Sequence, residues 1–217
     1  MIKTIFSFLI KTPLLLILLV LMAFKKLMSK SGNMNKFIEH VQKWEGGTSK
    51  ALTDTASKNP CPNTGGIHTN KGITWTTFKG LSSKLGYNYS KELFLSMPNN
   101  VWFEIFKQGY WNPYKLDILH KTKPNISYFV AQFAWGFGLG GSESRLANYQ
   151  RKYMNISDSN ITKSEIMENF RKDIVPESIR LSHLIEYKKG VFKSLNQPKN
   201  LKGWLNRLAD FKKTFNS

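Results

Sequence analysis

"KWEGGTSKALTDTASKNPCPNTGGIHTNKGIT", residues Lys43–Thr74, follows one helical pattern of apolar residues and ends where a second begins. Glu45 stands where the first pattern stops, because Gly46 and Gly47 favour the left-handed cap of a helix. A carboxylate at that end faces the negative pole of the helix dipole, which is unfavourable. Local conflicts of this kind concentrate at functional sites, so Glu45 is a candidate catalytic acid.

The stretch after Glu45 is rich in Thr, Ser, Asn, Gly and Pro, which predicts a long loop or a loop with a small hairpin. Asp54 lies on it, nine residues after Glu45. Glycoside cleavage commonly uses two carboxyl groups, a protonated acid against an apolar wall and an ionised partner in a wetter place. On spacing alone, a solvated Glu45 and an Asp54 that caps a turn are favoured over catalysis.

The rest of the chain reads as mostly α, with at most a small β element within residues 48–75. Helical periodicity resumes at Ile73, and helices are expected at 90–97, 99–110 and 201–215. The apolar run Ile126–Phe137 predicts a buried helix that is broken by the glycines of GFGLGG. The further expected helix boundaries are Ser142 as the N-cap of a helix through Met154, a Thr162–Glu165 capping box, a start at Pro176 and an end before Gly190.

The charge is strongly positive, with 32 Lys and Arg against 14 Asp and Glu and a net charge of +18. Such a surface attracts polyanions such as nucleic acid, anionic lipid or anionic cell wall, and a lysine-rich soluble surface explains it equally well. No nucleic-acid motif is present and the aromatic residues do not interleave with a basic cluster, so we expect no nucleic-acid partner. One cysteine, Cys61, and four scattered histidines give neither a disulfide nor a zinc pattern.

The first 30 residues differ from the remainder. Ile5–Phe24 contains one charge, Lys11, in 20 residues, which is long enough to span a bilayer. No small-residue cleavage site follows, and this favours an uncleaved signal anchor over a cleaved signal peptide or a buried helix. The lysines behind the apolar run would retain the domain in the cytoplasm, whereas a cell-wall function requires the other side. The sequence leaves that conflict open.

Two motifs in order resemble the opening of glycoside hydrolase family 108, a bacterial and phage lysozyme-like family. The first is Glu45-Gly46-Gly47, and the second is GGIHTNKGIT at Gly65–Thr74. Tyr110-Trp111 resembles the family's Tyr-Trp segment, and Gly203–Arg207 resembles its C-terminal Gly-Trp-Leu-x-Arg. The resemblance covers about residues 34–210, including a second half that is described in this family as a predicted peptidoglycan-binding region.

The resemblance implies hydrolysis of the bond between N-acetylmuramic acid and N-acetylglucosamine in peptidoglycan, with no metal and no cofactor. The family's catalytic glutamate maps onto Glu45, and the Asp and Thr of phage-type lysozymes map onto Asp54 and Thr69. The residues expected to contact the glycan are Asn70, Trp75, Tyr110 and Trp111. The aromatic residues among them are chosen because flat rings stack on sugar faces, and Trp135 is a further aromatic candidate.

The chain departs from the family pattern in the loop. Thr48 replaces a common Tyr, and TDTASKNPCPNTGG replaces a loop that commonly carries two Asp-Pro pairs. These differences concern the shape of the loop and the second carboxylate.

We therefore expect a signal anchor at 1–30, a lysozyme-like catalytic region at 31–120 and a helical peptidoglycan-binding region at 121–217, packed together. The predicted function is a membrane-anchored N-acetylmuramidase on the extracytoplasmic side, serving phage or prophage lysis or wall remodelling. The alternative is a wall-binding protein on the same fold without activity. A lytic transglycosylase that uses Glu45 alone is a mechanistic variant, and the oligomeric state is not defined.

Overall fold

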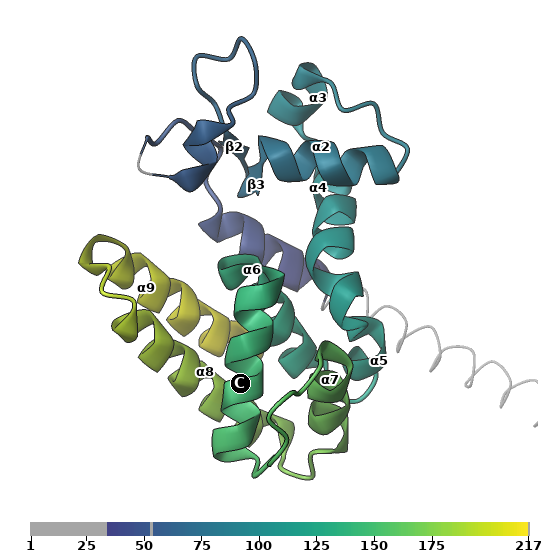
Figure 1. The fold of residues 1–217 in the computed structure, drawn as a ribbon, viewed down its shortest axis with the longest axis vertical. Helices are drawn as coiled ribbons and strands as arrows, with labels where there is room; N and C mark the ends of the chain where they lie inside the picture. The colour runs from purple at the N-terminus through teal and green to yellow at the C-terminus, as the bar shows by residue number, and fades with distance from the viewer. Residues whose placement is uncertain (1–33, 53, 217) are drawn as a thin grey trace, which may run out of the picture. The chain divides into compact units, whose positions relative to one another are not determined.

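The computed structural model describes residues 34–52 and 54–216 (Figure 1). The chain divides into two units, with the boundary between residues 42 and 43. Residues 34–44 are helical, as the apolar pattern predicts. The expected membrane segment at 1–30 lies outside the described residues. Within the described ranges, no helix has the length and apolar character needed to cross a bilayer.

The expected small β element is a three-stranded antiparallel sheet in the order β1-β2-β3. The strands are β1 (Thr48–Ser49), β2 (Thr69–Asn70) and β3 (Ile73–Thr74). In the register, Ser49 pairs with Thr69 and Asn70 pairs with Ile73. Lys71 and Gly72 form the two-residue turn between β2 and β3, with φ values of 46° and 75°. Two successive positive φ values define the type I′ turn that suits a tight hairpin.

The segment between β1 and β2 contains the 3-10 turn η1 (Thr55–Lys58). Asp54 caps this turn, because its side chain accepts a hydrogen bond from the Ala56 backbone N–H at 2.9 Å. Asp54 therefore caps a turn, and its side chain remains 45% exposed.

Short helices follow the sheet. Thr74 caps α2 (Trp75–Lys84) and Ser90 caps α3 (Lys91–Ser96), each through a side chain that accepts a backbone N–H. α4 (Asn99–Phe106) continues directly into a π-helical turn, η2 (Lys107–Trp111), and π turns inside helices are frequent at functional sites. The 3-10 turn η3 (Asn112–Tyr114) and the helix α5 (Leu116–His120) complete this region.

The longest helix is α6 (Pro124–Tyr153), and α5, α7 (Lys163–Lys172) and α8 (Glu177–Ser194) pack around it (Figure 1). α9 (Pro198–Phe215) packs against α8. The predicted break in α6 is present as one non-helical glycine, Gly138, with φ 69° and ψ 169°. The fold is thus a mostly α globular domain with a small sheet.

Two helix boundaries predicted from the sequence are wrong. Ser142 is not an N-cap: it is buried inside α6 and its hydroxyl donates back to the carbonyls of Gly138 and Leu139. Gly190 does not follow the end of α8 but lies within it. The capping box of Thr162 and Glu165 is confirmed.

One buried charge stands out in the core of this helical region. Lys188 of α8 is 2% exposed, and its ammonium lies 3.2 Å from Gln132 Oε1. Four phenylalanine rings surround it at 5.1–6.0 Å, namely Phe129, Phe133, Phe137 and Phe192. Burial lowers the pKa of Lys188 to about 7, and the Arg207 guanidinium acts in the same direction.

Replacing this lysine is expected to change how stability depends on pH. An unfolded lysine stays protonated up to about pH 10.4, so between about pH 7 and that value the unfolded chain binds one more proton than the folded chain. The free energy of unfolding of the wild type, relative to Lys188→Met, therefore rises by about 2 kcal/mol between pH 7 and 9. Denaturant melts at several pH values measure this difference.

The matched control is Lys193→Met, because Lys193 is an exposed lysine on the same helix. Its difference from the wild type should not vary with pH over this range. A difference for Lys188→Met that is equally flat would show that Lys188 does not lose its proton in the folded state.

Candidate active site

Glu45 follows the end of the helical residues 34–44 and is largely buried, with 13% of its side chain exposed. The Trp135 indole N–H donates a 2.7 Å hydrogen bond to its Oε1. Arg207 Nη2 lies 2.8 Å from the same oxygen. Among the described residues, Oε2 accepts no hydrogen bond. One oxygen is therefore fixed by two donors, and the other remains available to a ligand.

The hairpin turn between β2 and β3 touches this second oxygen. A Cβ built on Gly72 would overlap Glu45 Oε2 and would lie 2.6 Å from Cζ2 of Trp135. The φ of +75° at Gly72 also disfavours any side chain. Gly72 is thus the residue that lets the turn approach the carboxyl group.

The opposite side of the turn is fastened by three hydrogen bonds. The Trp102 indole N–H donates to the Lys71 carbonyl at 2.9 Å. Lys71 Nζ donates to the Met97 carbonyl at 2.9 Å and to Asn99 Oδ1 at 3.1 Å. These contacts hold the hairpin in a fixed position against Glu45, as a preorganised site requires.

Aromatic rings form the apolar wall beside Glu45. Trp135 lies 4.9 Å from Tyr110, 5.3 Å from Phe106 and 5.6 Å from Trp102, measured between ring centroids. Burial raises the pKa of Tyr110, and the nearby charge of Glu45 raises it further. Tyr110 therefore stays a neutral phenol that can donate a hydrogen bond next to the carboxyl group.

α9 contacts the residues that immediately precede Glu45. Arg207 Nη2 donates to the Trp44 carbonyl at 2.9 Å. The Trp44 indole N–H donates to Asp210 Oδ2 at 2.8 Å, and Lys43 Nζ donates to Asp210 Oδ1 at 2.9 Å. The C-terminal helix thereby fixes the backbone and one side chain next to the carboxyl group.

Asp54 and Thr69 meet through a histidine that the sequence analysis did not select. His68 is fully buried; its Nδ1 lies 2.9 Å from Thr69 Oγ1 and 4.0 Å from Asp54 Oδ2. Its Nε2 lies 3.1 Å from the Ala51 carbonyl, which can only accept, so Nε2 carries the hydrogen. In neutral His68 the Nδ1 atom accordingly accepts a hydrogen bond from the Thr69 hydroxyl.

Three of the expected sugar contacts are buried instead. Trp75 is 7% exposed and packs on Phe78 and Phe94, while Trp111 is 2% exposed and donates to Asp117 Oδ1 at 3.0 Å. Asn70 is 3% exposed and donates to the carbonyls of Phe94 and Leu95 at 2.7 and 3.0 Å. The polar groups and rings of all three are thus engaged inside the fold. Of the four expected contacts, Tyr110 lies beside Glu45.

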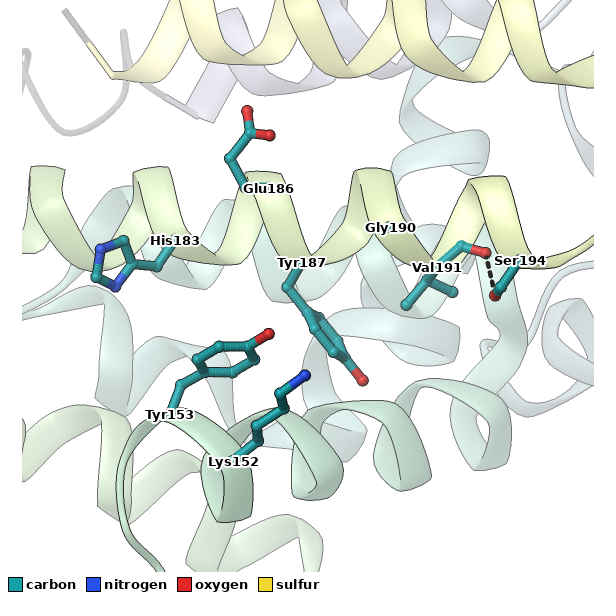
Figure 2. A pocket seen from close by; sticks show the side chains of 8 residues that line it. All are labelled: Lys152, Tyr153, His183, Glu186, Tyr187, Gly190, Val191 and Ser194. Atoms are coloured by element: carbon teal, nitrogen blue, oxygen red, sulfur yellow. Dashed lines mark hydrogen bonds between the residues drawn. The ribbon is translucent and has the colours of Figure 1, made fainter.

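A second candidate surface is a groove of about 460 Å³ between α6 and α8. Figure 2 shows Lys152 and Tyr153 extending from α6 toward Tyr187 of α8. The rings of Tyr153 and Tyr187 meet edge to face at 6.1 Å, and Tyr153 is 45% exposed. The remaining lining residues are His183, Glu186, Gly190, Val191 and Ser194.

Neither region shows a metal site. Throughout residues 34–52 and 54–216, no three His, Cys, Asp or Glu side chains are grouped so that they could hold an ion. The single thiol, Cys61, is buried.

The sequence analysis missed the residues that position Glu45 from a distance. Trp135 was noted only as a possible ring for sugar, and Arg207 only as part of a motif in the C-terminal helix. A helical pattern identifies the face of α9 that is buried, but it does not say which residue meets that face. Gly72 and His68 lie inside the second motif, Gly65–Thr74, and that motif was the signal that could have identified them as site residues.

Comparisons with known proteins show what the sequence and the fold of this chain are similar to. Residues 38–138 match the sequence model of the family described as Glycosyl hydrolase 108. The solved structure of Brucella abortus SagA is similar in fold, with a TM-score of 0.59 and 21% identity, over 86% of this chain and 97% of that one. No curated protein sequence matches significantly.

Proposed function

We propose that the chain is an N-acetylmuramidase of peptidoglycan, from the match of residues 38–138 to the model of the family described as Glycosyl hydrolase 108. The bond cleaved is the one between N-acetylmuramic acid and N-acetylglucosamine. The observation that carries the proposal is Glu45, a largely buried carboxyl group with one oxygen held by Trp135 and Arg207 and the other presented beside the β2–β3 turn.

In the proposed reaction Glu45 is the general acid. The protonated form that reacts would carry its proton on Oε2, because Oε1 already accepts from two donors. This proton moves to the glycosidic oxygen as the bond between that oxygen and the anomeric carbon breaks, and the oxygen keeps the bonding electron pair. Tyr110, a neutral phenol beside the carboxyl group, is the proposed hydrogen-bond donor to the sugar.

Asp54 and Thr69 are proposed to act on the water that completes hydrolysis. The exposed Asp54 carboxylate is the proposed base or the charge that stabilises the sugar cation. Since the Thr69 hydroxyl hydrogen points to His68 Nδ1, the free lone pairs of Thr69 Oγ1 accept a hydrogen from water. His68 would thus orient the water through Thr69.

The products distinguish this mechanism from its variant. The full chain and Asp54→Asn are incubated with purified peptidoglycan, and the soluble fragments are identified by mass spectrometry. Reducing muramic acid ends from the wild type, with a rate about 100-fold lower in Asp54→Asn, are expected. Anhydromuramic ends, with Asp54→Asn as active as the wild type, would instead establish a transglycosylase that uses Glu45 alone.

The groove between α6 and α8 is the proposed second contact with the cell wall. Two tyrosine rings offer flat surfaces, and Lys152 supplies a cation for the carboxylates of peptidoglycan stem peptides (Figure 2). In this proposal, the groove is the surface through which residues 121–217 would bind the wall. A folded chain that binds the wall but yields no fragments would favour the alternative of an inactive binder.

We further propose that residues 1–30 anchor the chain in a membrane with the enzyme facing the wall, in lysis or remodelling by a phage, a prophage or the host bacterium. The support is the apolar run Ile5–Phe24 and the position of the substrate outside the cytoplasm. The lysines that follow the run oppose this orientation. Digestion of the domain by protease added to intact spheroplasts tests it, and complete protection would place the domain in the cytoplasm.

A further inference from the structure

We propose that Arg207 is a positioning residue for the Glu45 carboxyl group, so that the C-terminal helix α9 is part of the active site. Arg207 lies outside residues 38–138, which match the family model. The inference rests on the proposed role of Glu45 as the general acid, and it adds a residue and a helix that this role requires.

The position of Arg207 offsets the unfavourable interaction between the Glu45 carboxylate and the negative end of the helix dipole. Arg207 Nη2 contacts both Glu45 Oε1, at 2.8 Å, and the Trp44 carbonyl, at 2.9 Å. The last carbonyls of a helix lack partners within it and carry the negative end of its dipole. One guanidinium therefore satisfies a helix-end carbonyl and balances the carboxylate next to it.

Packing fixes the place of this guanidinium. Asp210, one turn after Arg207 on α9, accepts from the Trp44 indole at 2.8 Å. Phe211 packs 5.8 Å from Phe129 of α6, and Phe215 packs 5.3 Å from Tyr128. The Arg207 side chain is 23% exposed. Since apolar contacts seat α9 on α6, the cation is positioned before any substrate arrives.

The chemistry assigns Arg207 a role during proton transfer. When the Oε2 proton leaves for the glycosidic oxygen, the full negative charge of the carboxylate develops beside Nη2 of Arg207. A preorganised cation at that position stabilises charge that appears in the transition state, which raises kcat more than it strengthens substrate binding. Together with the Trp135 indole it also keeps Oε1 engaged, so that Oε2 faces the substrate.

The test compares Arg207→Gln with Lys202→Gln, an exposed lysine on the same helix, using soluble uncrosslinked glycan strands as substrate. Both variants lose one positive charge. Arg207→Gln is expected to lower kcat about 100-fold with KM within about twofold of the wild type. Lys202→Gln should match the wild type, and Arg207→Lys should retain about a tenth of the activity, because lysine offers a cation without the planar fork.

Chemical rescue separates this role from a merely structural one. Guanidinium at millimolar concentration is expected to restore part of the kcat of Arg207→Ala, while Glu45→Gln gains nothing. The far-UV spectrum and melting temperature of each variant are recorded alongside. Loss of activity without rescue in a variant that melts early would overturn the proposal, since the arginine would then only support the fold.

Two further outcomes are decisive. A kcat of Arg207→Gln equal to that of Lys202→Gln, with Glu45→Gln inactive, would refute the role of Arg207 and leave the muramidase intact. A wild-type chain that releases no fragments refutes the muramidase itself, and this result is visible before any Arg207 variant is compared.

Discussion

Gly72→Ala is expected to lower the rate of peptidoglycan hydrolysis by about 100-fold, with a modest loss of stability. The added methyl group would overlap Glu45 Oε2 and the Trp135 ring. The turn cannot withdraw easily, because the Trp102 indole and the Lys71 ammonium fasten its other side. The carboxyl group therefore has to move, and a shift of about 1 Å in a reacting group is enough for an effect of this size.

Gly66→Ala is the matched control for Gly72→Ala. Gly66 also has a positive φ, +92°, but a Cβ there would meet nothing within 4 Å. Both variants pay the same kind of backbone strain, about 1 kcal/mol, so both should melt at a somewhat lower temperature. Hydrolysis rates on purified peptidoglycan should fall in Gly72→Ala alone. Equal rates for the two variants would show that the turn does not position Glu45.

Local signals in the sequence predict the elements well where a side chain caps or ends a helix. The capping box of Thr162 and Glu165 predicts the start of α7, and Pro176 directly precedes α8. The prediction that α8 ends before Gly190 is wrong because the packing of the buried neighbours Lys188 and Phe192 outweighs the low helix propensity of glycine. The prediction that Ser142 is an N-cap is wrong because α6 resumes directly after Gly138, four residues earlier.

The position of Glu45 could be predicted from the sequence, because the helix end and the two glycines are local features. Its partners could not: Trp135 lies 90 residues away and Arg207 reaches the adjacent Trp44 carbonyl across 163 residues. Such pairings depend on how α6 and α9 pack, which periodicity does not reveal. The catalytic roles of Glu45, Asp54 and Thr69 remain predictions.

Sequence also does not show which aromatic residues line the site and which are buried in the core. Trp75, Trp111 and Tyr110 look alike as candidate sugar platforms in the sequence. In the fold Trp75 and Trp111 are buried among other side chains, whereas Tyr110 lies against Trp135 at the site. Large aromatic side chains dominate the energetics of cores as well as of interfaces, so their identity alone does not mark a binding surface. The expected boundary between regions 31–120 and 121–217 stays a prediction, although Glu45 draws partners from the second region.

Glu45→Gln is expected to have the largest effect of all. Glutamine can still accept hydrogen bonds from Trp135 and Arg207 through its carbonyl oxygen, so the fold and the affinity for the wall should be retained. It cannot release a proton to a leaving group, so hydrolysis should fall at least 1,000-fold, by order of magnitude.

The most direct measurement is the initial rate at which the full chain and Glu45→Gln release reducing ends from purified peptidoglycan, with wall binding and melting temperature recorded for both. A wild type that releases muramic acid ends, beside a folded, wall-binding Glu45→Gln variant that releases none, is the result that the proposed mechanism predicts. A folded Glu45→Gln variant that cleaves at the wild-type rate would contradict it.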